Sequence, residues 1–347
     1  MKNFLKYKTK DNPPPKFGID HSIFKELKIT YLCPISDHTG DGASGGVKVI
    51  YKHSEEINKL LSPKFKSSVL HPEKVNFYCN WFDYSIEFKR NLNFNPNKEF
   101  VIIPDFWAER YSPQCKANNI KYGIFVQNGY LFGNNDNAST YSAFQGAEII
   151  MTISEDTTDC CALAFPELSS KIMRMHFFVD SNKFVPDLQK ENIITYMPRK
   201  LSRHSKLVIF FLTHYLPEHW NIIQIHNKTE KEVIETLKKS KIFLSFSELE
   251  GWGLPPIEAG LTGNKVIGYT GEGGKEYWHP PIFKEVMMGD VKGFVKEIIT
   301  EIHKFDSDNS FKADETAIGQ LADLYSKERE SSDIIALSKK ISAVLSI

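Results

Sequence analysis

Short, continuous apolar runs recur along the chain and limit its fold more than any other feature. In the second half they cover 193–197, 221–225, 242–246 and 265–268. In the first half they cover 29–33, 75–79, 100–103, 123–126 and 149–152. The runs lack apolar–polar alternation, as expected for strands that are buried on both faces of a parallel sheet. They therefore predict parallel strands in both halves of the chain.

Helix-like segments separate these runs. Residues 46–61 carry apolar side chains on one stripe, and Thr229–Glu232 form a capping box that opens a helix to about Lys238. We predict a helix over 201–214, because parallel strands at 193 and 221 need a crossover between them. The tail from about 312 to 347 is helical in pattern. Strand–helix alternation in both halves predicts two doubly wound, Rossmann-like α/β domains.

The length of 347 residues is about twice the commonest domain size and supports two domains. We place the boundary in the polar stretch 186–192. The N-terminal domain is then 1–188 and the C-terminal domain is 189–324. A final helix over about 325–347 is expected to pack back on the first domain, and we expect the two domains to face a cleft.

Charge and cysteine content limit the classes of partner. Lys+Arg and Asp+Glu are balanced at 43 each, so no global field favours nucleic acid or a membrane, although a local basic patch is compatible with this balance. The five cysteines form no CxxC pair and fit free thiols in a reducing compartment. No secretory signal or bilayer-spanning run is recognisable. These features predict a cytoplasmic protein, either soluble or membrane-peripheral.

The stretch Ser245–Trp278 carries the most specific pattern. Ser245 is expected to end a strand, Glu250–Gly253 to form a tight turn, and Pro255 or Pro256 to begin a helix. This order places a helix N-terminus at the carboxyl edge of a parallel sheet, where α/β proteins bind ligands. Free N–H groups and the helix dipole make that end suitable for an anion.

Two carboxylates flank this turn. Glu250 in the loop is placed to reach ligand hydroxyls, and Glu258 in the first helical turn is placed to accept hydrogen bonds from a diol such as ribose. The alternative is that both are ordinary acids at the start of a helix. The Gly-Trp-Gly-Leu-Pro-Pro sequence between them favours the nucleotide interpretation.

Within Ser-Glu-Leu-Glu-Gly-Trp-Gly-Leu-Pro-Pro-Ile-Glu-Ala, the pair resembles the EX7E signature of retaining GT-B glycosyltransferases, especially family 4. The likeness continues through 263–267 and ends at 273–277, while Gly260 departs from it. It is specific over about 193–280 and looser over 28–155. It implies that Glu258 binds the donor ribose and Glu250 the donor sugar. It also implies that the backbone at Gly253 and Leu254 faces the sugar and diphosphate.

Two adjacent cations, Arg199 and Lys200, follow the strand that ends near Tyr196. Cations at a helix start are unfavourable with the dipole, which indicates a nearby anion. The resemblance implies that they hold the donor diphosphate and offset the charge of the leaving group without a metal, with Tyr196 also on the donor side. Exposed, solvated charges are the alternative.

Gly45 and Gly46 lie in a glycine-rich loop that opens the helix 46–61. This loop resembles the N-terminal-domain loop that approaches the donor diphosphate in GT-B enzymes; a flexible loop with a helix cap is the alternative. Residues 40–45 also match GxGxxG, but they stand too far from the preceding strand for a dinucleotide fingerprint. Asp37 and His38 lie close by, and a lone histidine is more often structural.

Asn128 and Tyr130 follow one predicted strand, and Asp105 follows the preceding one. We expect these three residues to line the acceptor side or the donor-sugar pocket. Histidine and cysteine are scattered, and Asp306–Asp308 match DxD only in a polar loop, so no metal site is predicted. No cofactor is expected beyond the nucleoside diphosphate sugar as donor substrate.

The sequence therefore predicts transfer of a hexose or deoxyhexose from a nucleoside diphosphate sugar to an unknown hydroxyl acceptor. A glycan, a lipid-linked glycan, a protein and a modified nucleobase are all open as acceptors, and other nucleic-acid binding is not expected. Retention of configuration is implied by the resemblance alone. The alternatives are a GT-B nucleotide-sugar epimerase and a non-catalytic sugar-nucleotide-binding subunit. Nucleotide release that depends on acceptor would favour transfer over both.

Overall fold

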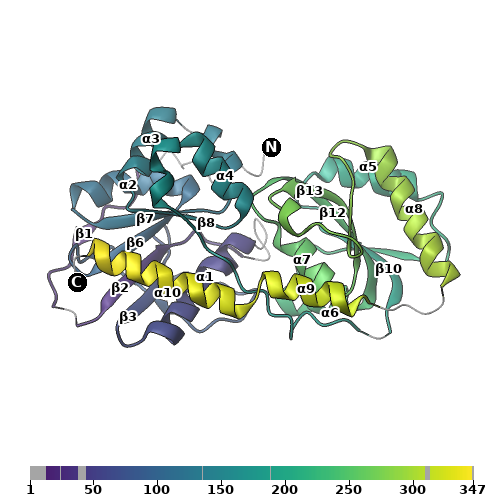
Figure 1. The fold of residues 1–347 in the computed structure, drawn as a ribbon, viewed down its shortest axis with the longest axis horizontal. Coiled ribbons are helices and arrows are strands. Elements are labelled where there is room, and N and C mark those ends of the chain that lie inside the picture. Colours follow the sequence, from purple (N-terminus) through teal and green to yellow (C-terminus); the bar gives the residue numbers. More distant parts are fainter. Residues whose placement is uncertain are drawn as a thin grey trace. The chain divides into compact units, whose positions relative to one another are not determined.

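The computed structural model describes residues 13–23, 25–37, 44–134, 136–187, 189–308 and 313–345. The chain forms two compact units: unit 1 is Met1–Phe177 with Glu328–Ile347, and unit 2 is Phe178–Lys327 (Figure 1). The chain passes from unit 1 to unit 2 between Phe177 and Phe178. This point lies before the polar stretch 186–192 in which the domain boundary was expected.

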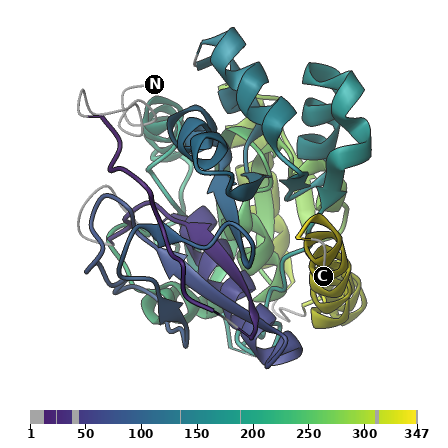
Figure 2. The ribbon, with the colours of Figure 1, turned by 90° about the vertical axis from the view of Figure 1, so that its left-hand side faces the viewer.

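Unit 1 contains a seven-stranded parallel sheet in the order β4-β3-β2-β6-β7-β8-β9. Its strands are β2 (Leu27–Leu32), β3 (Phe65–Leu70), β4 (Glu87–Phe88), β6 (Glu99–Pro104), β7 (Lys121–Val126), β8 (Ile149–Thr152) and β9 (Ile172–Arg174). A separate pair joins β1 (Gly18–Ile19) to β5 (Asn93–Phe94). Helices α1 (Gly45–Leu61) and α10 (Lys327–Val344) cover one face of the larger sheet. Helices α2 (Ala108–Ala117), α3 (Asn137–Gly146) and α4 (Glu155–Ala164) cover the other (Figures 1 and 2).

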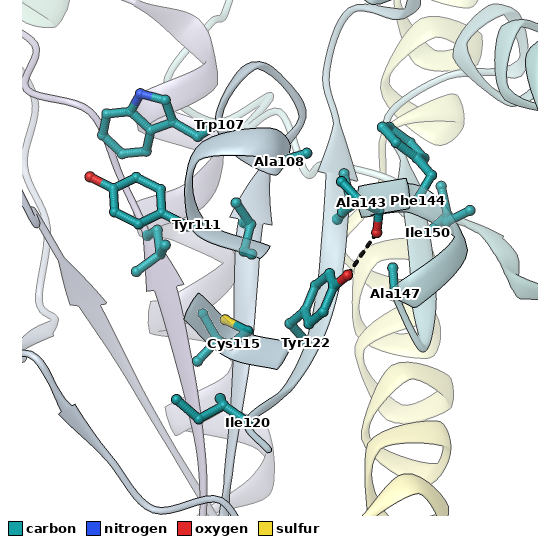
Figure 3. Packing of buried hydrophobic residues seen from close by; sticks show 14 of the residues in the cluster. Trp107, Ala108, Tyr111, Cys115, Ile120, Tyr122, Ala143, Phe144, Ala147 and Ile150 are labelled. Carbon is teal, nitrogen blue, oxygen red and sulfur yellow. Dashed lines mark hydrogen bonds between the residues drawn. The ribbon is translucent and has the colours of Figure 1, made fainter. Parts of the chain in front are cut away.

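The core of unit 1 lies between its sheet and α2 and α3 (Figure 3). Every residue of β6 is buried, as the continuous apolar run predicts. From β7, Tyr122 reaches α3, where its hydroxyl donates to the carbonyl oxygen of Ala143 at 2.7 Å. Its ring therefore packs in the core while its polar group is satisfied.

Unit 2 contains a five-stranded parallel sheet in the order β11-β10-β12-β13-β14. Its strands are β10 (Glu191–Tyr196), β11 (Asn221–Gln224), β12 (Ser240–Glu250), β13 (Lys265–Glu272) and β14 (Phe283–Glu285). Helices α5 (Ser202–Leu212) and α8 (Val291–Ser307) lie on one face. Helices α6 (Glu230–Lys239), α7 (Leu254–Leu261) and α9 (Glu315–Leu324) lie on the other (Figure 1).

The predicted fold class is confirmed, because both units have doubly wound parallel sheets. The capping box is also present: Thr229 accepts from the Glu232 N–H, and the Glu232 carboxylate accepts from the Thr229 N–H. Helix α5 lies within the predicted 201–214. Helix α8 was not predicted.

The predicted strand at 75–79 is wrong. These residues lie in the connection between β3 and β4, and the strand is β3, with the sequence Phe-Lys-Ser-Ser-Val-Leu. The serines make this strand hard to recognise from hydropathy. Ser67 is nevertheless buried, because its polar groups are hydrogen-bonded. Its hydroxyl contacts that of Ser54 at 2.9 Å, and its N–H donates to Asn58 Oδ1 at 2.6 Å. Side chains of α1 thus supply hydrogen bonds to the polar groups of Ser67. A hydropathy pattern alone would treat these polar groups as evidence against a buried strand.

Each sheet reverses its strand order once. In unit 1 the chain runs from β2 to β3 and β4 on one side, then returns to β6 on the other side of β2. In unit 2 it runs from β10 to β11, then returns to β12 on the other side of β10. Open α/β sheets bind ligands outside the carboxyl ends of the strands at such reversals. A ligand site is therefore expected at the loops after β2, β6, β10 and β12.

Gly268 allows β13 to pack closely on β12. Its φ is +139°, and a Cβ atom there would lie 2.2 Å from the carbonyl oxygen of Ser245 and 2.7 Å from the Phe294 ring. Gly268→Ala is expected to lower the free energy of unfolding by about 2–4 kcal/mol, measured by chemical denaturation. Gly319→Ala on α9 meets nothing within 4 Å and should be neutral or stabilising by up to about 1 kcal/mol. Equal effects of the two substitutions would contradict this packing.

Candidate functional site

The strand-order reversal of unit 2 brings Lys200 and Glu250 together. Lys200 lies in the loop between β10 and α5, and Glu250 is the last residue of β12. The Lys200 ammonium forms an ion pair with the Glu250 carboxylate, and the two side chains are only 23% and 15% exposed. Two residues that are distant in sequence thus meet where the fold favours a ligand.

The electrostatics of this loop favour an added anion. Burial and the neighbouring Arg199 guanidinium lower the pKa of the Lys200 ammonium, and the Glu248 carboxylate opposes that shift. A bound phosphate would add a second anionic partner for the two adjacent cations.

Tyr196, the last residue of β10, has its hydroxyl engaged with the neighbouring strand. The hydroxyl donates to Gln224 Oε1 at the end of β11, at 3.1 Å. Its ring lies edge-on to Phe246, with ring centroids 6.0 Å apart. Tyr196 therefore helps to shape the carboxyl edge of the sheet beside Arg199 and Lys200.

The turn before α7 is held in a defined conformation. Gly253 is the N-cap with φ +86°, a conformation that glycine adopts without strain. The Tyr277 hydroxyl donates towards the carbonyl oxygens of Gly253 at 2.8 Å and Trp252 at 3.1 Å. The Gly273 N–H donates to the carbonyl oxygen of Glu250 at 3.0 Å. Sequence reasoning gave Tyr277 no role, although it lies within the 273–277 segment that carries the family likeness.

Two details of this motif differ from expectation. First, β12 does not end at Ser245 but continues to Glu250, because it pairs with β13 as far as Glu250↔Glu272. Glu250 is thus the end of a strand rather than part of a loop. Second, α7 begins at Leu254, so Glu258 lies in the second helical turn, and this residue is 6% exposed. The helix dipole acts mainly within the first turn and contributes less to Glu258 than predicted.

In unit 1, Gly45 and Gly46 are the first two residues of α1, after β2. Gln127, after β7, donates from Nε2 to the carbonyl oxygen of Gly46 at 3.1 Å. The Ser44 N–H donates to the Ser36 hydroxyl at 3.1 Å. The remaining residues of the GxGxxG match, 40–43, and His38 lie outside the described residues.

Asp105, directly after β6, fixes the turn after β7. Its Oδ2 accepts from the backbone N–H groups of Gln127 at 3.2 Å and Asn128 at 3.1 Å, and burial raises its pKa to about 6. Asn128 Oδ1 in turn accepts from the Tyr130 N–H at 3.0 Å. Asp105 therefore positions the two neighbouring candidates through backbone hydrogen bonds.

Asp156 is a further member of this cluster that sequence reasoning missed. Its Oδ1 accepts a hydrogen bond of 2.7 Å from the Tyr130 hydroxyl. Asp156 lies in the first turn of α4, which Ser154 and Thr157 open with a capping box. That Ser-Glu-Asp-Thr sequence was the available signal, because such a box places a helix start at the carboxyl edge of the sheet.

The described part of the chain contains no group of three or more His, Cys, Asp or Glu residues that could hold a metal ion. The DxD match begins with Asp306, which lies in the last turn of α8 rather than in a loop, and its carboxylate accepts from the Trp220 indole N–H at 2.9 Å. None of the described helices is both long and apolar enough to cross a membrane.

No family model matches this chain. A curated relative, an alpha-1,6-glucosyltransferase of Actinobacillus pleuropneumoniae serotype 7 (strain AP76), is 35% identical over 97 residues, which cover 25% of this chain. The match spans 29% of the length of that relative.

Solved structures match over nearly the whole chain. Sucrose-phosphate synthase from Thermosynechococcus elongatus has a TM-score of 0.67 at 10% identity, covering 92% of this chain and all of that one. Anabaena HepE in complex with UDP has a TM-score of 0.62 at 9% identity, covering 91% and 100%. The catalytic domain of starch synthase IV from Arabidopsis thaliana has a TM-score of 0.60 at 10% identity, covering 93% and 100%. The chain therefore has the parallel α/β fold of GT-B glycosyltransferases.

Proposed function

We propose that this protein is a glycosyltransferase that moves a sugar from a nucleoside diphosphate sugar to a hydroxyl acceptor. The observation that carries the proposal is the Lys200–Glu250 ion pair at the strand-order reversal of unit 2. The ion pair joins the loop that carries Arg199 and Lys200 to the turn at the N-terminus of α7. Cations and N–H groups suited to phosphates therefore lie beside a carboxylate suited to sugar hydroxyls. The fold and the glucosyltransferase relative support the same activity.

In this proposal Arg199 and Lys200 bind the diphosphate, and the backbone at Gly253 and Leu254 adds N–H donors. Glu250 binds hydroxyls of the transferred sugar, and its ion pair with Lys200 fixes its position before the donor arrives. This assignment follows the EX7E likeness of family 4.

The remaining donor-side roles rest on the same likeness. Glu258 binds the ribose, for which its burial supplies a low-dielectric setting. The donor-binding roles of Tyr196, Gly45 and Gly46 stay predictions.

The reaction breaks the bond between the anomeric carbon and the diphosphate oxygen and forms a bond from that carbon to the acceptor oxygen. Arg199 and Lys200 stabilise the negative charge that develops on the leaving diphosphate, without a metal ion. The acceptor hydroxyl gives its proton to a leaving phosphate oxygen on the same face of the sugar. This route retains the anomeric configuration and needs no protein nucleophile.

We propose a hexose as the transferred sugar and UDP-glucose as the first donor to test. One relative carries a glucosyltransferase name, and a structural neighbour was solved in complex with UDP-glucose. Asn128 and Tyr130 are proposed to contact the acceptor, held in place by Asp105 and Asp156.

Donor binding is tested by thermal shift with UDP-, GDP-, dTDP- and ADP-sugars. A donor present at about 100 times its Kd should raise stability by about 2.7 kcal/mol. Glu258→Ala and Arg199→Ala are expected to abolish the shift, and Glu250→Ala should retain the shift with bare nucleotide. Glu235→Ala, on the exposed face of α6, is the control. If no sugar nucleotide stabilises the wild type, or if Glu258→Ala responds like the wild type, the site assignment fails.

Leaving-group stabilisation is tested with Lys200→Ala. Loss of one pre-positioned cation should lower kcat by about 10²–10³-fold in an assay of acceptor-dependent nucleotide release. Lys239→Ala removes a lysine that is 60% exposed and should leave kcat unchanged. Unaltered kcat in Lys200→Ala would remove Lys200 from the reaction. Nucleotide binding without any acceptor-dependent release in the wild type would favour a binding subunit.

The acceptor side is tested with Asp105→Ala. Without the carboxylate, the N–H groups of Gln127 and Asn128 lose their acceptor and the turn after β7 loosens, at a cost of about 1–3 kcal/mol in stability. We expect a higher KM for the acceptor while the donor thermal shift persists. A variant that loses donor binding but keeps the acceptor KM would contradict this division of roles.

A further inference from the structure

Helix α5 has an unusual distribution of apolar residues. Its inner face, with Ser205, Val208 and Leu212, is buried, and Val208 and Leu212 belong to the unit 2 core. Large apolar side chains are exposed to solvent on its other side and just beyond its C-terminal end. They are Phe210 at 65% exposed, Tyr215 at 62%, Phe211 at 43% and Leu207 at 36%.

We call this surface the α5 outer face; its residues are Arg203, Lys206, Leu207, Phe210, Phe211 and Tyr215. Residues 203, 207 and 210 are spaced by four and three, which aligns them on one side of the helix. Figure 1 shows α5 beside α8 on one face of the unit 2 sheet. An exposed cluster of this size is more than the scattered single apolar residues that soluble proteins tolerate, so it indicates a binding surface.

The charge of the segment indicates what binds there. Residues 201–217 contain two cations, Arg203 and Lys206, and no aspartate or glutamate. Both cations are exposed beside the apolar side chains. Lysine and arginine next to exposed phenylalanine and leucine on one helix are typical of helices that lie in the interface of an anionic membrane. Their long stems lie along apolar surface while their charges reach the headgroups.

Charge also argues against a second copy of this chain as the occupant. A two-fold contact through this face would place the same surface of two copies together, so that each cationic surface would meet another cationic surface. Like charges at such a contact oppose association. Anionic lipid instead complements both the cations and the apolar side chains.

We propose that the α5 outer face docks the protein on membranes that contain anionic lipid. Phe210, Phe211 and Leu207 enter the headgroup–acyl boundary, and Arg203 and Lys206 contact lipid phosphates. The proposal is independent of the glycosyltransferase assignment, because it uses none of the residues placed in the donor or acceptor site.

The test is flotation of the full chain with vesicles of phosphatidylcholine alone and of phosphatidylcholine with phosphatidylglycerol. The wild type is expected to float with the anionic vesicles and to lose binding as salt rises. Phe210→Ser/Phe211→Ser should weaken partitioning by about tenfold or more through lost apolar burial. Arg203→Gln/Lys206→Gln should weaken it by about tenfold and reduce its salt dependence.

Tyr141→Ser/Leu163→Ser is the matched control, since it removes two exposed apolar side chains of unit 1, 41% and 87% exposed, and should bind like the wild type. Unchanged melting temperatures establish that the variants remain folded. The proposal is overturned if the wild type ignores anionic vesicles or if the double phenylalanine variant binds them normally. It is equally overturned if sedimentation shows a wild-type dimer that this variant converts to a monomer.

Discussion

The ion pair between Lys200 and Glu250 is the interaction on which the candidate site depends. Lys200 follows β10 and Glu250 ends β12, and these two strands are neighbours at the reversal of strand order in the sheet. Both are largely shielded from water, so separating them would leave a poorly solvated charge on each side. The pair therefore fixes the loop before α5 against the turn before α7. A diphosphate sugar that binds here would meet groups that are already in place.

The two units hold the loops at the carboxyl edges of their sheets by different interactions. In unit 2, opposite charges and the Tyr277 hydroxyl hold the loops at the carboxyl edge. In unit 1, a buried carboxylate does so: Asp105 accepts backbone N–H groups from the turn after β7. The hydrogen-bond partners of Asp105 are uncharged backbone N–H groups. Burial raises the pKa of Asp105 to about 6. Both edges are rigidified by polar contacts that have their partners within the same unit.

Most of the fold could be predicted from the sequence, because the apolar runs of buried parallel strands are continuous. The prediction failed at β3, where Ser67 is buried through pairing with Ser54 and Asn58, which only the folded helix α1 supplies. The proximity of Lys200 and Glu250 was predictable from the family likeness, but the register of the motif around Glu250 was not. The positive φ of Gly253 sets the start of α7 at Leu254 and moves Glu258 to the second turn. The role of Tyr277 depends on long-range contacts that no spacing encodes, and for Asp156 the capping box indicates a helix start but not the contact with Tyr130.

The most direct test of the central claim is a crystal structure of the protein with UDP. The account predicts that the phosphates lie within hydrogen-bonding distance of Arg199, Lys200 and the backbone N–H groups at the start of α7. The ribose should then lie at Glu258. Ordered UDP whose phosphates contact neither Arg199 nor Lys200 would contradict the account.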